Sequence, residues 1–167
     1  DHGVVSCGTG SLDHPTAELT WGLIIALLRC IPLEDANLRV GGAWQRSVGV
    51  DLKGRTLGII GLGKIGFRVA MRAKAFGMRI LVYDKYLSTD SFNYTESGAI
   101  ACSLEEVLEQ SDFVTIHVPL NDETRNYCDE AFFSRMKPAA FFLNQARGGL
   151  VDEDAIVRAL KENRIAG

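Results

Sequence analysis

The 167-residue sequence has few residues of the kinds that bind metal ions or form disulfides. Its three histidines and four cysteines are scattered along the chain, and no two cysteines form a CxxC motif. Disulfide frameworks and zinc sites need such residues at short, regular spacings. We therefore expect no metal site. We interpret Cys7, Cys30, Cys102 and Cys128 as unpaired thiols of a reducing compartment.

Strong charge of one sign and long hydrophobic runs are also missing. The formal net charge is only −3, which gives no indication of a basic face for nucleic acid or for an anionic membrane. The most apolar run, 21–28, lies between Glu18 and Arg29 and is far shorter than the ~20 residues that span a bilayer. No secretory signal is visible. The sequence predicts a cytoplasmic protein with no nucleic-acid partner and no membrane partner.

What the sequence does contain is an alternation of short apolar strands and helices. We predict strands at 56–60, 79–83, 113–117 and 139–143, with a weak one near 99–100. Helices are predicted at about 64–76, 103–110, 129–135 and 152–162, the second opening with a capping box. This alternation is typical of an α/β fold, a doubly wound parallel sheet with helices on both faces.

A GxGxxG motif follows the first strand and reads Gly61-Leu62-Gly63-Lys64-Ile65-Gly66. Gly61 permits a tight turn, Gly63 lets the backbone approach a pyrophosphate, and Gly66 lets helix and strand pack closely. The N-terminus of the following helix offers free N–H groups and a positive dipole to phosphates. In this strand–turn–helix context the motif predicts a Rossmann-type dinucleotide site.

Asp84 ends the second strand, 18 residues after Gly66. A carboxylate at this position accepts hydrogen bonds from an adenosine ribose diol and repels a 2′-phosphate. The cofactor is therefore predicted to be NAD. Lys85 follows directly and could pair with a phosphate, so NADP stays open as an alternative. The less favoured alternative is that Asp84 is only a strand-end acid that starts the next turn.

Two further polar segments follow strands and are expected at the same edge of the sheet. His117-Val118-Pro119-Leu120 ends the strand at 113–117. His117 is a candidate general base, although we favour its lining the cofactor pocket. Arg147 lies on a Gly-flanked loop after the last strand, where a fixed cation could hold a carboxylate and polarise a keto oxygen. An ordinary surface arginine is the alternative.

A long apolar helix precedes these units. It is predicted to run from Pro15 to about residue 31, to be interrupted at Pro32, and to resume as far as about residue 39. Trp21, Ile24 and Leu28 lie on one side, while Leu23 and Leu27 occupy the other. A helix that is apolar all round must be covered on several faces. These faces could be covered by the core of the same domain or by a second subunit, and the sequence leaves both alternatives open.

Taken together, these residues resemble the NAD-binding domain of the D-isomer-specific 2-hydroxyacid dehydrogenases. The family's landmarks occur in its own order along nearly the whole chain: Ala17-Glu18, Leu52-Lys53-Gly54-Arg55-Thr56, the 61–66 motif, Ala75-Phe76-Gly77-Met78, Tyr83-Asp84, the 117–120 segment, Met136-Lys137-Pro138, Ala146-Arg147-Gly148-Gly149 and Val151-Asp152-Glu153. The resemblance implies hydride transfer between a nicotinamide and C2 of a small 2-hydroxy or 2-keto acid, in a cleft between two domains.

The resemblance also implies a role for each matching position. Arg147 becomes the catalytic arginine that holds the substrate carboxyl and keto groups. Asp84 holds the adenosine ribose, and the 61–66 loop holds the pyrophosphate. The cofactor site is further lined by His117, Val118, Pro119, Thr124, Gln145 and Ala146, with Gln145 standing where the family commonly has Thr or Ser.

Other parts of the family's enzymes lie outside this sequence. The acid/base histidine and its orienting Glu are expected beyond residue 167, so His117 is withdrawn as the base. Residues 1–11 are expected to be a remnant of the hinge and substrate domain, and 12–167 the NAD-binding domain, incomplete at its C-terminal end. We expect the isolated chain to bind NAD without turning over substrate.

The family's enzymes usually dimerise, which predicts a homodimer through the helix region 16–44. The alternative function is an NAD-sensing interaction protein, as in the C-terminal binding protein corepressors, since a fold does not fix a function.

Overall fold

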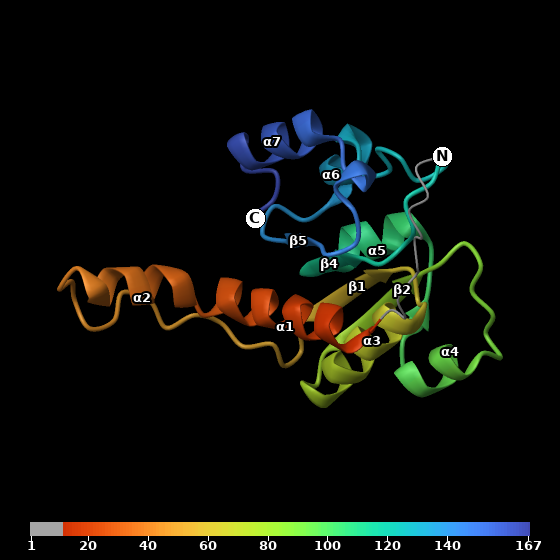
Figure 1. Ribbon diagram of the computed structural model, residues 1–167, viewed down its shortest axis with the longest axis horizontal. Helices are drawn as coiled ribbons and strands as arrows, with labels where there is room; N and C mark the ends of the chain where they lie inside the picture. The colour runs from red at the N-terminus through yellow and green to blue at the C-terminus, as the bar shows by residue number, and fades with distance from the viewer. Residues whose placement is uncertain (1–11) are drawn as a thin grey trace, which may run out of the picture.

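The computed structural model describes residues 12–167 (Figure 1). Residues 1–11, the predicted hinge remnant, lie outside the described residues. One parallel sheet is built from β1 (Thr56–Ile60), β2 (Arg79–Tyr83), β3 (Ile100–Ala101), β4 (Phe113–Ile116) and β5 (Phe141–Asn144). The strand order is β3-β2-β1-β4-β5, so the chain moves outward from β1 in both directions. This order confirms the predicted doubly wound fold.

Helices cover both faces of the sheet (Figure 1). One face carries α1 (His14–Leu28) and α3 (Lys64–Ala75), with α4 (Phe92–Ser97) packed against α3; the other carries α5 (Leu104–Gln110), α6 (Glu130–Arg135) and α7 (Glu153–Lys161). Each face has its own apolar core: Ile59 and Val82 belong to one, Ile60 and Val114 to the other. Successive strand residues point to opposite faces, so both faces of β1 are buried.

From residue 56 onward the predicted elements lie close to the observed ones. The capping box is present: Ser103 Oγ accepts a hydrogen bond from Glu106 N at 3.1 Å, and the Glu106 carboxylate accepts one from Ser103 N at 2.9 Å. β5 begins at Phe141, two residues later than predicted, because a turn in which Ala140 N donates to Lys137 O precedes it.

Two short elements were missed, α4 and the 3-10 turn η1 (Gly148–Leu150). The six residues of α4 include few strong helix formers. Only its ends carry a signal, namely the Ser91 N-cap and Gly98 in the left-handed conformation at φ +69°.

The N-terminal helix breaks before Pro32 rather than at it. α1 ends at Leu28, and α2 runs from Ile31 to Arg39, with Cys30 between them at φ +52°. A proline ring inside a helix clashes with the carbonyl four residues earlier, which here belongs to Leu28. The first helix therefore ends there, and Pro32 lies in the first turn of α2.

α1 packs against α3, whereas α2 extends away from the sheet as an arm (Figure 1). One side of α1 is buried, whereas α2 has no buried residue. Within residues 12–167 no single helix is long and apolar enough to cross a bilayer. α1 and α2 meet that test of length and composition only as a pair, and they are bent by 64° from each other.

Candidate functional site

A cavity of about 770 Å³ lies where the carboxyl ends of β1, β2 and β4 meet. The strand register sets its position. Ile60 at the end of β1 pairs with Tyr83 of β2 and with Ile116 of β4, so the next residues, Gly61, Asp84 and His117, emerge side by side. The strand order reverses between β1 and β4, and this is where open α/β sheets bind ligands.

The three motif glycines are required for three different reasons. Gly61 has φ +93°, and a Cβ there would lie 3.0 Å from the His117 carbonyl carbon and oxygen. A Cβ on Gly66 would lie 2.1 Å from Gly61 O, so no side chain fits. At Gly63 no atom lies within 4 Å of an added Cβ, yet this residue forms part of the cavity wall. Packing therefore explains Gly61 and Gly66, whereas no contact within the described residues explains Gly63.

The first turn of α3 leads directly from this loop. Gly63 is the N-cap and supplies no side chain to the first-turn N–H groups, and the turn contains no acidic residue. Its free donors and positive dipole suit a pyrophosphate. Lys64, Ile65 and Gly66 form this turn and are not among the cavity-lining residues of the described chain.

Asp84 connects the glycine loop to the loop that follows β2. Its Oδ2 accepts a hydrogen bond from Leu62 N at 2.8 Å, and its Oδ1 accepts one from Tyr86 N at 2.8 Å. Each carboxylate oxygen keeps a second lone pair for a ribose hydroxyl. Lys85 does not stand free for a phosphate, because its Nζ lies 2.6 Å from the Glu123 carboxylate.

The loop after β4 forms the opposite wall. His117 Nε2 lies 3.1 Å from Thr115 Oγ1, and burial lowers the pKa of His117 to about 4. The ring is therefore neutral at pH 7, unsuited to general acid catalysis there. Val118, Pro119 and Thr124 line the cavity, and the Thr124 hydroxyl holds the turn by donating to Pro119 O at 2.7 Å.

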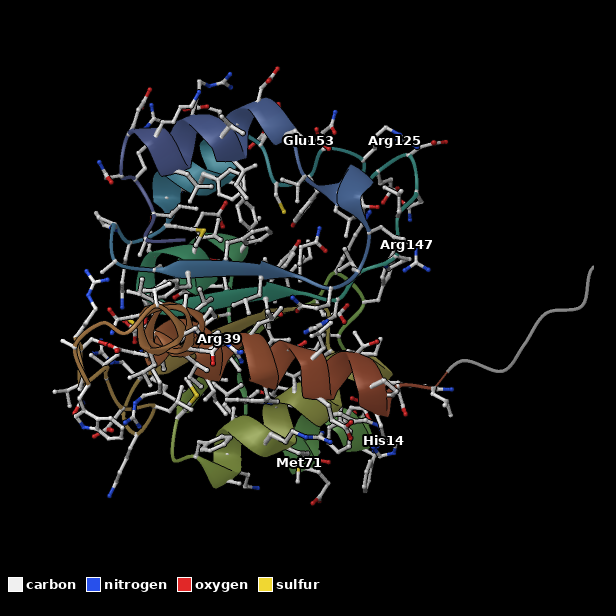
Figure 2. The ribbon with its side chains drawn as sticks, turned by 60° about the vertical axis from the view of Figure 1, so that its left-hand side comes forward. His14, Arg39, Met71, Arg125, Arg147 and Glu153 are labelled. Atoms are coloured by element: carbon white, nitrogen blue, oxygen red, sulfur yellow. The ribbon has the colours of Figure 1, made fainter. Side chains whose placement is uncertain are left out.

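Arg147 lies outside this cavity, on the loop that follows β5. Asn144 shapes the loop: its Oδ1 accepts from Ala146 N and its Nδ2 donates to Arg147 O, both at 2.9 Å. Figure 2 shows the Arg147 side chain extending away from the domain, with Arg125 on the same side. Within residues 12–167, no carboxylate lies within 4.0 Å of the Arg147 guanidinium.

Gln145 contacts α1 rather than the cavity. The buried Thr20 hydroxyl lies 3.0 Å from Gln145 Oε1, across 125 residues of sequence. Neither Gln145 nor Ala146 is among the described residues that line the cavity. This contact ties the loop before Arg147 to α1.

The sequence analysis missed one part of the cavity wall. Among the lining residues that it did not name are Tyr86, Leu87, Ser88, Ser91, Asn93 and Tyr127. Asn93 lies on α4, and its Nδ2 donates to Leu62 O of the glycine loop at 3.2 Å. Only the weak capping signals of α4 could have indicated this contact.

The model of the D-isomer specific 2-hydroxyacid dehydrogenase NAD binding domain matches residues 21–167. The chain belongs to this family. It is 42% identical to a glyoxylate reductase of Aeropyrum pernix over 165 residues, covering 94% of this chain and 49% of the relative. It is 44% identical to a D-3-phosphoglycerate dehydrogenase of Methanocaldococcus jannaschii over 153 residues, covering 89% of this chain and 28% of that protein.

Solved structures of the family superimpose on the chain. The apo D-lactate dehydrogenase of Escherichia coli matches with a TM-score of 0.88 at 31% identity, covering 95% of this chain and 49% of that one. The Aquifex aeolicus D-lactate dehydrogenase complexed with NAD and lactic acid matches with a TM-score of 0.86 at 35% identity. That match covers 93% of this chain and 46% of the other one. The chain thus spans half or less of these relatives. As an NAD-binding domain of this dehydrogenase family, it has NAD as its cofactor, as predicted.

Proposed function

We propose that the chain is the NAD-binding half of a dehydrogenase that interconverts a small D-2-hydroxy acid and its 2-keto acid. One observation carries the proposal: within the described residues, Arg147 is an exposed guanidinium without a carboxylate partner, held on a shaped loop at the cofactor edge of an NAD-binding domain. A fixed, unpaired cation beside a cofactor site suits an anionic substrate.

In this proposal, different residues of the chain bind the cofactor and the substrate. The 61–66 loop and the N-terminus of α3 hold the pyrophosphate, and Asp84 holds the adenosine ribose. When bound there, the reduced cofactor would be the source of the hydride that the keto carbon accepts. Arg147 binds the substrate carboxylate and stabilises the negative charge that grows on the keto oxygen. The proton that completes the hydroxyl requires a separate acid/base group, because His117 is neutral at pH 7 and its Nε2 lies 3.1 Å from Thr115 Oγ1.

The experiment replaces Arg147 in the full-length protein. NADH oxidation is measured with glyoxylate, hydroxypyruvate and pyruvate. Arg147→Ala should lower kcat/KM by about a thousandfold, since it removes a charged contact made to the developing oxyanion. Arg125→Ala, at an exposed arginine on the same side, should retain most of the rate. Unchanged turnover in Arg147→Ala would refute the assignment.

The alternative is an NAD-sensing interaction protein on the same fold. It gains support if the full-length protein binds NADH but reduces no 2-keto acid. The unpaired Arg147 favours the dehydrogenase.

We further propose that two copies of the protein associate through the arm, in the cytoplasm. Many large apolar side chains of region 16–48 are substantially exposed: Leu19, Leu23, Leu27, Ile31, Leu33, Leu38, Val40, Trp44 and Val48. The nine-residue α2 buries none of its residues within the chain, and so short a helix is marginal in water unless it packs against something. A second copy would cover it.

A further inference from the structure

An ion pair joins two loops of the cavity wall. Lys85 follows β2 directly after Asp84, and Glu123 lies in the loop after β4. Lys85 Nζ and Glu123 Oε2 are 2.6 Å apart, and both residues line the cavity. The carboxylate raises the pKa of Lys85, and the ammonium group lowers the pKa of Glu123. Both groups are therefore charged at neutral pH.

The fold gains little from this pair. The Lys85 and Glu123 side chains are 57% and 67% exposed, and exposed ion pairs contribute little to stability. Glu123 is instead positioned by its own turn, since its backbone N donates to Asn121 Oδ1 at 3.0 Å. The pair matters more inside the cavity. A ligand bound there displaces water, and the interaction between the ligand's charges and those of the pair is then less screened.

Lys85 is the cation next to the predicted ribose-binding residue, and a 2′-phosphate on that ribose would need it. While Lys85 is paired with Glu123, a 2′-phosphate would be repelled by the carboxylates of Asp84 and Glu123. The nearby cation, Lys85, would already be occupied by Glu123. We propose that Glu123 is a cofactor-specificity residue, which excludes NADP by withholding Lys85 from the 2′-phosphate. This inference rests on the proposed placement of the adenosine ribose at Asp84.

The test is to titrate Glu123→Gln and the unmodified 167-residue chain with NADH and with NADPH, following nicotinamide fluorescence. The glutamine keeps the shape of the side chain and removes its charge. NADPH should bind about tenfold more tightly to the variant, because one repulsive charge is lost and Lys85 becomes free to pair with the phosphate. NADH affinity should change less than about twofold. The gain for NADPH should shrink as salt is added.

Two controls isolate the role of Lys85. Asp122→Asn makes the same change of charge at the preceding residue, which is exposed and is not among the cavity-lining residues; it should leave the NADPH affinity unchanged. The double variant Lys85→Met with Glu123→Gln should lack the tenfold gain, because no freed cation is present. An equal gain in either control, or no gain in Glu123→Gln, would overturn the proposal.

Asp84→Ala separates this inference from the placement on which it rests. Weaker NADH binding in Asp84→Ala together with an unchanged NADPH affinity in Glu123→Gln would refute only the role of Glu123. NADH binding that is indifferent to Asp84→Ala would refute the ribose placement itself, and the specificity proposal with it.

Discussion

The β1–α3–β2 unit and the arm formed by α2 are opposite in burial. All five residues of β1 are buried, and Val69, Ala70 and Ala73 of α3 pack against the sheet. In the arm, α2 has no buried residue, and Trp44 beyond it is 82% exposed. The burial of the unit is therefore explained within the chain, whereas the apolar side chains of the arm stay exposed within it, and the proposed dimer would cover them.

The largest effect expected is from Gly66→Ala in the buried unit. The new methyl group would meet Gly61 O, so the loop must shift, and we expect unfolding free energy to fall by about 2–3 kcal/mol and NADH binding to be lost. Gly63→Ala is the matched control. It meets no protein atom, so stability should change by less than about 1 kcal/mol while NADH binding weakens. Urea denaturation and fluorescence titration measure both; equal destabilisation by the two variants would contradict the assigned roles.

The second prediction concerns pH and His117, at the end of the same sheet. Above pH 6.5 the ring is neutral in folded and unfolded protein, so stability does not depend on it. As pH falls from 6.5 to about 4, the unfolded state takes up the proton first, and the folded state loses stability. Because the ring is partly exposed, we expect a loss of about 2 kcal/mol rather than the full value of the shift.

Urea denaturation of wild type and His117→Asn between pH 8 and 4 tests this. Carboxylates such as Glu34, with a lowered pKa, also reduce stability in acid, so the difference between the two proteins is the informative quantity. The two pH profiles should run parallel above pH 7, and that of the wild type should fall more steeply below it. Parallel profiles throughout would show that His117 is not held neutral.

The third and smallest effect is expected in the arm, where an exposed leucine of α2 is compared with one of α7. Leu38 in α2 and Leu160 in α7 are 46% and 42% exposed, and each lies in a nine-residue helix. Leu38→Ala should weaken the proposed dimer about tenfold, since it removes an apolar side chain from the interface. Leu160→Ala should have no such effect. Sedimentation over a range of concentrations measures the dissociation constant, and equal behaviour of the two variants would argue against the arm as the interface.

Much of the fold could be predicted because its signals are local. Strand, turn and helix around Gly61–Gly66 are encoded in consecutive residues, and the capping box of Ser103 and Glu106 fixes the start of α5 within four residues. α4 was missed because it depends on contacts with α3 and on Asn93 reaching the glycine loop. The break at Leu28 was misplaced by three residues because the proline that causes it acts four residues earlier.

The candidate site likewise contains residues that local sequence predicts and contacts that it does not predict. Gly61, Asp84 and His117 were found because each directly follows a strand, and parallel strands bring their carboxyl ends to one edge. The partners of Lys85 and Gln145 were not found, because Glu123 and Thr20 are distant in sequence. The three motif glycines read alike in the sequence, and only the packing around them separates Gly63 from Gly61 and Gly66.

By itself, the sequence determined the α/β class, the family and the edge of the sheet where the candidate cofactor site lies, because turn chemistry, capping and the period of apolar residues act over a few neighbouring positions. Only the tertiary structure decided that Lys85 is paired with Glu123, that Gln145 contacts α1 and that α2 has no buried residue. Each of these depends on which distant segments meet, and that is set by the packing of the whole chain rather than by any local pattern.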